Sequence, residues 1–227
     1  MRKVLLFFFS HRLLAILRWD IHFMWIRACN LINGQSSQLS RALATQDRPL
    51  FLNLGSGPRG RRDKHWINID GFKDRNVDFV LDISRSLPFP AATFDGVFSE
   101  HVLEHFSLED GEKIAREVRR ILSPAGRFRI IVPDAALVLK RYFDAPEELI
   151  AWRGEGGTAM ETVNSFFRQR YEHQFLYDWP TMESMLTRAG FAVVQRSAFQ
   201  QSGCATMALD DPKYVWESLY VEAIAGR

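Results

Sequence analysis

Residues 50–54, with the sequence LFLNL, run directly into Gly55, Ser56 and Gly57. A mostly apolar run of this length is typical of a buried strand, and glycines permit positive φ angles and a close approach of a ligand to the backbone. In open α/β sheets, ligands bind at the carboxyl ends of the strands. This feature therefore predicts a sheet with a ligand site where its first strand ends.

The remaining chain alternates short apolar runs with helical periods, which favours a parallel sheet with crossover helices. The last two runs leave no room for a full helical crossover, so we expect them to form an antiparallel hairpin. Strands are predicted at 50–54, 66–69, 77–81, 94–99, 127–132, 191–196 and 214–223, and helices at 107–122 and 181–189. The expected fold is a doubly wound, seven-stranded mixed sheet with an N-terminal helical extension.

The first 32 residues carry five cationic side chains against one acid, although the whole chain has a net charge of only +2. The apolar run stops at His11, without a cleavage site, so a secretory signal is disfavoured. Charges interrupt every window long enough to cross a membrane. On a helix, one side would carry Leu6, Leu13, Leu17, Met24, Ala28 and Leu31. Two interpretations remain open and are compatible along different stretches: a helix that caps the domain, and a helix lying on anionic lipid.

Composition limits the partners and the redox compartment expected for the chain. The small net charge gives no field of the kind that drives nucleic-acid binding. The two cysteines, Cys29 and Cys204, form neither a disulfide framework nor a metal-binding spacing, which suits a reducing cytosol.

Residues 55–60 also match G-x-G-x-x-G, which is found in dinucleotide-binding enzymes. In those sites the last glycine opens an apolar helix, and an acid follows about 20 residues on. Here residues 59–65 are polar, and Asp70 follows Gly55 by only 15 positions. The pattern disfavours a dehydrogenase.

Two acids follow the next two strands. Asp70 ends the second strand, where a carboxylate can accept both hydroxyls of a ribose. Asp82 follows the third strand, where it can accept an adenine amino group while the Ile83 amide meets a ring nitrogen. Together with the glycine turn after the first strand, these two acids make three candidate binding positions after three successive strands, a pattern that favours a nucleoside site.

The motifs LNLGSGP, WINID, VDFVLDI, LPFPAATFDGVFSEHVLEHF and RILSPAGRFRIIVPD together resemble the type-11 superfamily of class I S-adenosylmethionine (SAM)-dependent methyltransferases. The resemblance spans residues 50–134 and continues more weakly to the end of the chain. It is strongest to a bacterial subgroup associated with surface-polysaccharide and glycolipid pathways.

The resemblance implies a Rossmann-like methyltransferase domain at 49–227, an insertion at 134–180 that covers the acceptor site, and a helical extension and linker at 1–48. It implies that the glycine turn lines the methionine end of SAM, that Asp70 holds the ribose and that Asp82 binds adenine. The chain departs from the family pattern at Asn53, where many relatives have an acid, and at Arg59, where many have glycine. The expected cofactor-binding residues are Asn53, Gly55, Ser56, Gly57, Asp70, Asp82, Ile83, Ser99 and Glu100.

The segment from His101 to His105 matches H-x-x-E-H, an inverted zinc-protease pattern. No further ligand is evident and the segment follows a strand, so we expect no metal site. His105 is expected to be structural and His101 to be an acid or base near the sulfonium. His173 lies in the segment that should cover the site and is the other candidate base. Four residues are expected either to line an acceptor pocket or to form a surface: Tyr142, Arg168, Arg170 and Tyr177.

The expected reaction transfers the methyl group of SAM to a nucleophile and releases S-adenosylhomocysteine. The preferred acceptor, from the resemblance alone, is a hydroxyl of a saccharide or glycolipid precursor. Methylation of nitrogen or carbon in another small metabolite is an alternative. A non-catalytic SAM-binding or scaffold protein of a glycan-assembly complex is another. We expect a small-molecule or glycan partner, no nucleic acid, and a cytoplasmic location that includes the inner face of the plasma membrane if residues 1–32 bind lipid.

Overall fold

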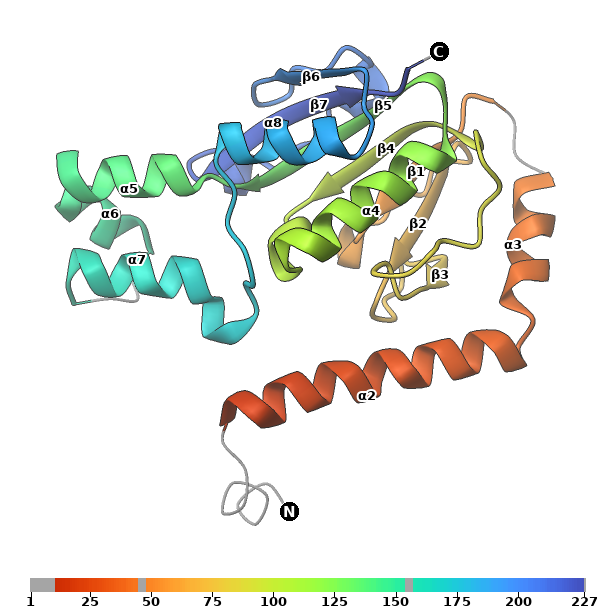
Figure 1. The fold of residues 1–227 in the computed structure, drawn as a ribbon, viewed down its shortest axis with the longest axis horizontal. Helices are drawn as coiled ribbons and strands as arrows, with labels where there is room; N and C mark the ends of the chain where they lie inside the picture. Colours follow the sequence, from red (N-terminus) through yellow and green to blue (C-terminus); the bar gives the residue numbers. More distant parts are fainter. Residues whose placement is uncertain (1–10, 45–47, 154–156, 227) are drawn as a thin grey trace.

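The computed structural model describes residues 11–44, 48–153 and 157–226. Seven strands form one mixed sheet in the order β3-β2-β1-β4-β5-β7-β6 (Figure 1). The strands are β1 (Phe51–Leu54), β2 (Trp66–Asp70), β3 (Phe79–Val80), β4 (Phe94–Glu100), β5 (Leu122–Pro133), β6 (Val193–Arg196) and β7 (Ser218–Ile224). The helices are α2 (His11–Ile32), α3 (Gln35–Ala44), α4 (Leu108–Ile121), α5 (Ala135–Asp144), α6 (Pro146–Arg153), α7 (Ala159–Arg168) and α8 (Trp179–Arg188).

The strand order winds outward in both directions from β1 and β4, which are parallel neighbours. β7 is antiparallel to both β5 and β6, so the predicted final hairpin is confirmed. The predicted α/β fold is therefore confirmed. The strand order reverses direction between β1 and β4, and open sheets of this kind bind ligands at such a switch point.

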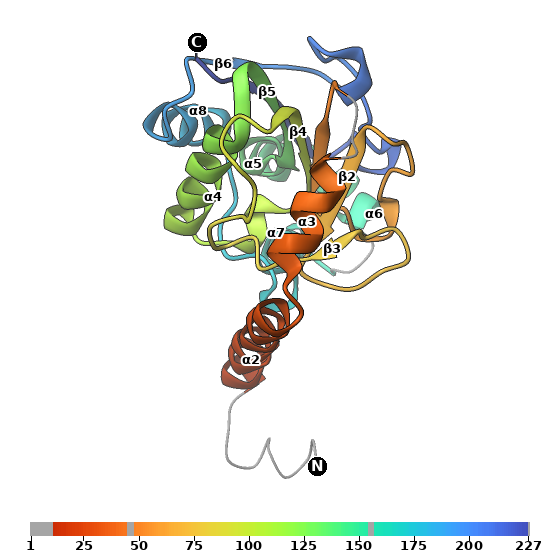
Figure 2. The same ribbon diagram turned by 90° about the vertical axis from the view of Figure 1, so that its right-hand side faces the viewer.

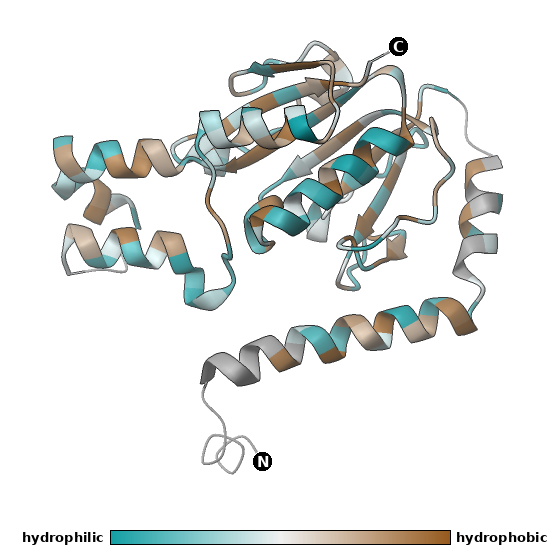
Figure 3. Ribbon diagram, viewed as in Figure 1, coloured by the Kyte–Doolittle hydropathy of each residue, from teal (hydrophilic) through white to brown (hydrophobic). Residues whose placement is uncertain are grey.

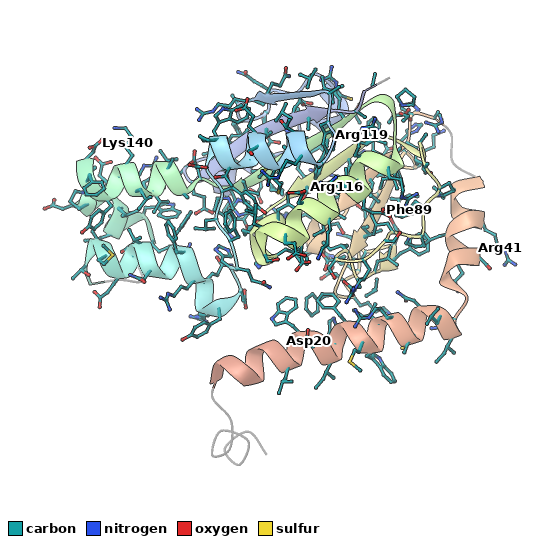
Figure 4. All side chains as sticks on the ribbon, in the orientation of Figure 1. Asp20, Arg41, Phe89, Arg116, Arg119 and Lys140 are labelled. Atoms are coloured by element: carbon teal, nitrogen blue, oxygen red, sulfur yellow. The ribbon has the colours of Figure 1, made fainter. Side chains whose placement is uncertain are left out.

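The main core lies between one face of the sheet and helices α3, α4 and α8. α4 buries Ile114, Val118 and Ile121 at helical spacing, and the Ser107 hydroxyl accepts the Asp110 amide at its start, as predicted. Hydrophilic residues occupy the opposite side of α4 (Figure 3). Arg116 is exposed on this outer side (Figure 4). The opposite face of the sheet has its own apolar cluster, to which the 199–209 segment contributes.

Three strand predictions need correction. The fifth strand was expected at 127–132 but begins at Leu122, because Leu122 already pairs with Phe94 of β4. The third strand was expected at 77–81 but contains only two residues. Its start is lost because the Asp78 carboxylate, rather than a backbone carbonyl, accepts the Asn68 amide at 2.8 Å. The last strand begins at Ser218 rather than at residue 214, because Asp211 and Pro212 start a 3-10 turn that ends at Tyr214.

Residues 134–180 form α5, α6, α7 and the start of α8 rather than strands, and α5–α7 stand beyond one end of the sheet (Figure 1). They enclose a separate apolar cluster that includes Val138, Leu149, Val163 and Phe166. Trp152 of α6 stacks on Trp216 with ring centroids 4.3 Å apart, which ties this helical layer to the segment before β7.

The N-terminal helix α2 extends along and away from the body of the domain (Figure 2). Its inner side packs on the loop after β2: His22 stacks on Phe72 at 4.4 Å, and Trp19 meets the same ring edge-on at 5.2 Å. The side of α2 that carries Trp19 and His22 thus faces the domain. The side with Leu17, Met24 and Leu31, which the sequence showed to be apolar, faces outward. Leu6 and the rest of residues 1–10 lie outside the described residues. No described helix is both long and apolar enough to cross a membrane.

Candidate active site

The glycine turn follows β1 as predicted. Gly55 and Gly57 have φ angles of +70° and +49°, in the left-handed region that side chains disfavour. The amides of Gly55 and Ser56 both donate to the Ile69 carbonyl, at 2.9 and 3.0 Å. A β-carbon on Gly55 would lie 2.3 Å from Cγ2 of Val102. The turn is therefore fixed between β2 and the segment after β4.

Asp70 ends β2 and supports this turn. Its Oδ2 accepts the Gly57 amide at 2.8 Å, and its Oδ1 accepts the Phe72 amide at 2.8 Å. An ionised carboxylate has about four acceptor positions, so roughly half of the acceptor capacity of Asp70 remains. Its position and partial exposure suit a ligand with hydroxyl groups.

Asp82 is more heavily engaged. The carboxylate is buried, its Oδ1 accepts from the amide and hydroxyl of Ser84 at 3.1 and 2.6 Å, and its Oδ2 pairs with Arg27 of α2 at 3.0 Å. Ile83 is buried beside it. Neither residue lines a described cavity. The structure therefore brings a residue from the N-terminal extension to the expected adenine position.

Asn53, Ser99 and Glu100 lie on the central strands. All three are buried, and within the described residues the Ser99 hydroxyl has no hydrogen-bond partner. The Glu100 carboxylate pairs with Arg59 at 2.7 Å and accepts the Asp211 amide at 2.8 Å. Burial raises the pKa of Glu100 more than these two partners lower it.

Two cavities meet at the glycine turn and share Gly55, Ser56, Arg59 and Glu100. The smaller has a volume of about 370 Å³ and extends toward Asn53. The larger, of about 530 Å³, opens over the carboxyl ends of β1 and β4. Its remaining lining residues are Gly57, Pro58, His101, Glu104, His105, Trp152, Arg153, Gln169, Lys213, Tyr214 and Glu217.

His101 projects into the larger cavity from the end of β4. Its ring stacks on Tyr214 with centroids 4.0 Å apart. Nδ1 lies 3.3 Å from Oε1 of Glu104, and Nε2 lies 3.1 Å from the Ser218 hydroxyl and 4.0 Å from Oε1 of Glu217. Burial raises the pKa of Glu217, although His101 opposes this shift. The site therefore contains a group of acids and a histidine suited to proton transfer.

His173 does not belong to the cavity wall. It is buried and lines neither cavity; its ring contacts His105 at 5.2 Å, and its Nδ1 is 2.9 Å from the Phe166 carbonyl. Burial lowers the pKa of His173, and the nearby Glu104 carboxylate only partly offsets this. The four residues predicted to line an acceptor pocket or to form a surface, Tyr142, Arg168, Arg170 and Tyr177, do not line the described cavities. Tyr177 is fully buried in the main core.

Sequence reasoning missed Glu217 and Tyr214 as cavity residues, because the segment that carries them was expected to be a strand. It also took Arg59 only as a departure from the family pattern. Arg59 bridges Glu100 and Asp211, at 2.7 and 2.9 Å, and so closes one side of both cavities. A cation within a glycine turn was the available signal for this role.

Comparison with known proteins bears directly on this site. A family profile described as a methyltransferase domain matches residues 62–130, which include Asp70, Asp82 and the segment after β4. Over 56 residues the chain is 41% identical to the uncharacterized methyltransferase YcgJ of Bacillus subtilis, a match that covers 25% of this chain and 21% of that protein.

Solved methyltransferase structures share the fold of this domain. The YcgJ structure superposes with a TM-score of 0.50 at 17% identity, covering 86% of this chain and 99% of that one. Phosphoethanolamine N-methyltransferase 2 of Haemonchus contortus, solved with SAM, gives a TM-score of 0.51 at 16% identity, covering 91% and 56%. The family match and the shared fold support a class I SAM-dependent methyltransferase domain with SAM as its cofactor.

Proposed function

We propose that this chain transfers the methyl group of SAM to a hydroxyl of a saccharide or glycolipid precursor. The observation that carries the proposal is the larger cavity, which joins the glycine turn to His101 and Glu217 at the carboxyl ends of β1 and β4. A ligand placed there would meet the glycine turn with the Ser56 hydroxyl on one side and proton-accepting groups on the other. The saccharide acceptor rests on the sequence resemblance and on the polar lining of the cavity.

Most of the residues expected to bind SAM have polar groups that suit it. The Ser56 hydroxyl is buried without a partner among the described residues and lines both cavities, and Asp70 retains acceptor capacity for ribose hydroxyls. Asp82 fits less well, because Ser84 and Arg27 use most of its acceptor positions. When bound, SAM supplies an electrophilic methyl group on a sulfonium.

The protein would contribute placement and proton transfer. Holding an acceptor in line with the methyl group replaces an encounter between two molecules, worth about 7–11 kcal/mol in the best cases. The hydroxyl loses a proton as the new bond forms, and His101 and Glu217 lie on the cavity wall to receive it. Burial that raises the pKa of Glu217 makes this carboxylate a better base.

The test measures binding and turnover separately. Calorimetry should detect SAM binding, and Asp70→Ala should weaken it by about 1.5–3 kcal/mol, roughly ten- to a hundred-fold. Labelled SAM should then methylate saccharide or lipid-linked saccharide acceptors, and Glu217→Gln should lower kcat with SAM affinity unchanged. Binding without product from any acceptor class would instead indicate a scaffold, and product only from amine or carbon acceptors would exclude the hydroxyl.

We also propose that the outer side of α2 rests on an anionic bilayer, which would place the enzyme beside a lipid-linked acceptor. Exposed apolar side chains line this side: Ile21, Met24, Trp25, Leu31 and Ile32. Residues 1–32 carry five cationic side chains against one acid, and one of these cations, Arg27, pairs with Asp82 of the domain. Apolar insertion together with positive charge is the combination that binds such surfaces.

Vesicle sedimentation tests this placement. Trp25→Ser combined with Ile21→Ser should reduce binding to anionic vesicles, whereas Phe143→Ser, which removes an exposed aromatic ring from α5, should not. Equal binding of all three proteins would refute the lipid contact. A concentration-dependent dimer that the α2 changes dissociate would assign the same surface to a second copy of the chain.

A further inference from the structure

Three metal-ligating side chains meet at the edge of the larger cavity: Glu104, His105 and His173. One ligand atom from each lies within 4.8 Å of the others. Glu104 and His105 belong to the turn after β4, whereas His173 comes from the segment between α7 and α8. The Glu104 carbonyl accepts the Gln174 amide at 2.8 Å, so a backbone contact holds these two segments together.

Both histidines are oriented in the manner of metal ligands. Nδ1 of His105 lies 3.1 Å from the Glu172 carbonyl, and Nδ1 of His173 lies 2.9 Å from the Phe166 carbonyl. A carbonyl only accepts hydrogen bonds, so each ring carries its proton on Nδ1 and, when neutral, has a lone pair on Nε2. Histidines that bind metals almost always donate their other ring N–H in this way.

Glu104 is the more unusual member of the cluster. Its side chain is fully buried, and neither carboxylate oxygen has a hydrogen-bond partner among the described residues. His101 is within ion-pair distance, at 3.3 Å, but serves one oxygen only. Burying a carboxylate is costly unless it is paired or coordinates a metal, and Oε2 of Glu104 has neither kind of partner among the described residues.

We propose that Glu104, His105 and His173 bind a divalent transition-metal ion through one carboxylate oxygen and two Nε2 atoms. Two histidines and one carboxylate bind zinc or iron(II) in catalytic sites that keep positions open for water or substrate. The sequence pattern pointed to His101 and His105 and showed no further ligand. The structure instead groups His105 with Glu104 and with His173, which lies 68 positions beyond His105.

The location assigns the ion a role in acceptor binding, a step that rests on the proposed function. Glu104 and His105 line the cavity that contains the glycine turn, so an ion held by them would border the space proposed for the acceptor. A bound divalent ion lowers the pKa of a hydroxyl it contacts. In that arrangement the acceptor oxygen would bond to the methyl carbon as the carbon–sulfur bond breaks, the electron pair would stay on sulfur, and Glu217 or His101 would receive the hydroxyl proton.

Metal binding is measured on the full chain without any assay of turnover. After removal of metals with a chelator, cobalt(II) is titrated while its visible absorption is recorded, and manganese(II) is followed by electron paramagnetic resonance. We expect one saturable site, and at least tenfold weaker binding in His173→Ala, His105→Ala and Glu104→Gln.

His65→Gln is the matched control, because its Nδ1 also lies 3.0 Å from a backbone carbonyl but it is not part of the cluster. Circular dichroism checks the fold of each variant, and His173→Gln replaces any variant that does not fold. Absence of a saturable site in the native chain, or equal binding in the His173 variants and the control, overturns the proposal.

Calorimetry with SAM on the same samples separates the two proposals. Metal binding without SAM binding would refute the proposed function and leave the metal site standing. SAM binding and methyl transfer that are unaffected by chelation, with no cobalt spectrum, would refute the metal site alone.

Discussion

The substitution Gly55→Ala tests how tightly the glycine turn is packed. The left-handed conformation costs a non-glycine residue about 1–2 kcal/mol. The new β-carbon would lie 2.3 Å from Cγ2 of Val102, and overpacking of this kind costs about 1–3 kcal/mol. We therefore expect the free energy of unfolding to fall by roughly 2–5 kcal/mol.

A double mutant separates these two terms. Val102→Ala removes both methyl groups that meet the new atom, and the remaining contact, with the Val102 β-carbon, is 3.3 Å. The pair of changes should then cost about 1–3 kcal/mol less than the sum of the single changes. Gly34→Ala measures the backbone term alone, because its φ is +59° and nothing lies within 4 Å of an added β-carbon.

Urea unfolding followed by circular dichroism gives each free energy by linear extrapolation. Additivity of Gly55→Ala and Val102→Ala within about 0.5 kcal/mol would refute the steric explanation. A cost for Gly55→Ala no larger than that for Gly34→Ala would do the same. Either result would mean that the turn is not held closed by the segment after β4.

Three further outcomes are expected. Asp210→Asn should lower the free energy of unfolding by up to about 3–5 kcal/mol in urea titration, because it leaves the fully buried Arg129 with only the more distant Glu222, at 3.7 Å, as a charged partner. Asp178 caps α8, and its hydrogen bonds to Thr181 lower its pKa below the ordinary value of 3.8. Native Asp178 should therefore stabilise the fold above pH 3.8 and lose that contribution as the pH falls further. The free energy of unfolding of Asp178→Ala should lack this pH dependence. Arg27→Ala should tighten SAM binding up to about fivefold in calorimetry, the equivalent of ~1 kcal/mol, by freeing Oδ2 of Asp82; unchanged affinity would exclude Asp82 from adenine binding.

The features that follow from local rules were predictable from the sequence. The strand before Gly55, the cap at Ser107 and the strand-end positions of Asp70 and Asp82 depend on residues only a few positions apart. Apolar periodicity and turn chemistry are sufficient to place such features. The same rules gave the antiparallel final hairpin, because chain length alone disfavoured a helical crossover.

Features that depend on distant residues were not predictable. Arg27 and Asp82 are 55 positions apart, and no periodicity links them. The sequence also left open which side of α2 packs on the domain; ring stacking of His22 on Phe72 decides it, and hydropathy alone does not predict that contact. The approach of His173 to Glu104 likewise depends on backbone contacts between two loops.

The small apolar cluster of α5–α7 is packed separately from the main core, which affects how substitutions in these helices act. Because Val138, Leu149, Val163 and Phe166 bury one another rather than joining the main core, substitutions there leave the packing beneath the sheet intact. We propose that the choice of acceptor can change by exchange of this helical layer, while the residues after β1 and β2 that are expected to bind the cofactor stay the same. We expect grafts of this layer between relatives to exchange what is methylated without cost to cofactor affinity.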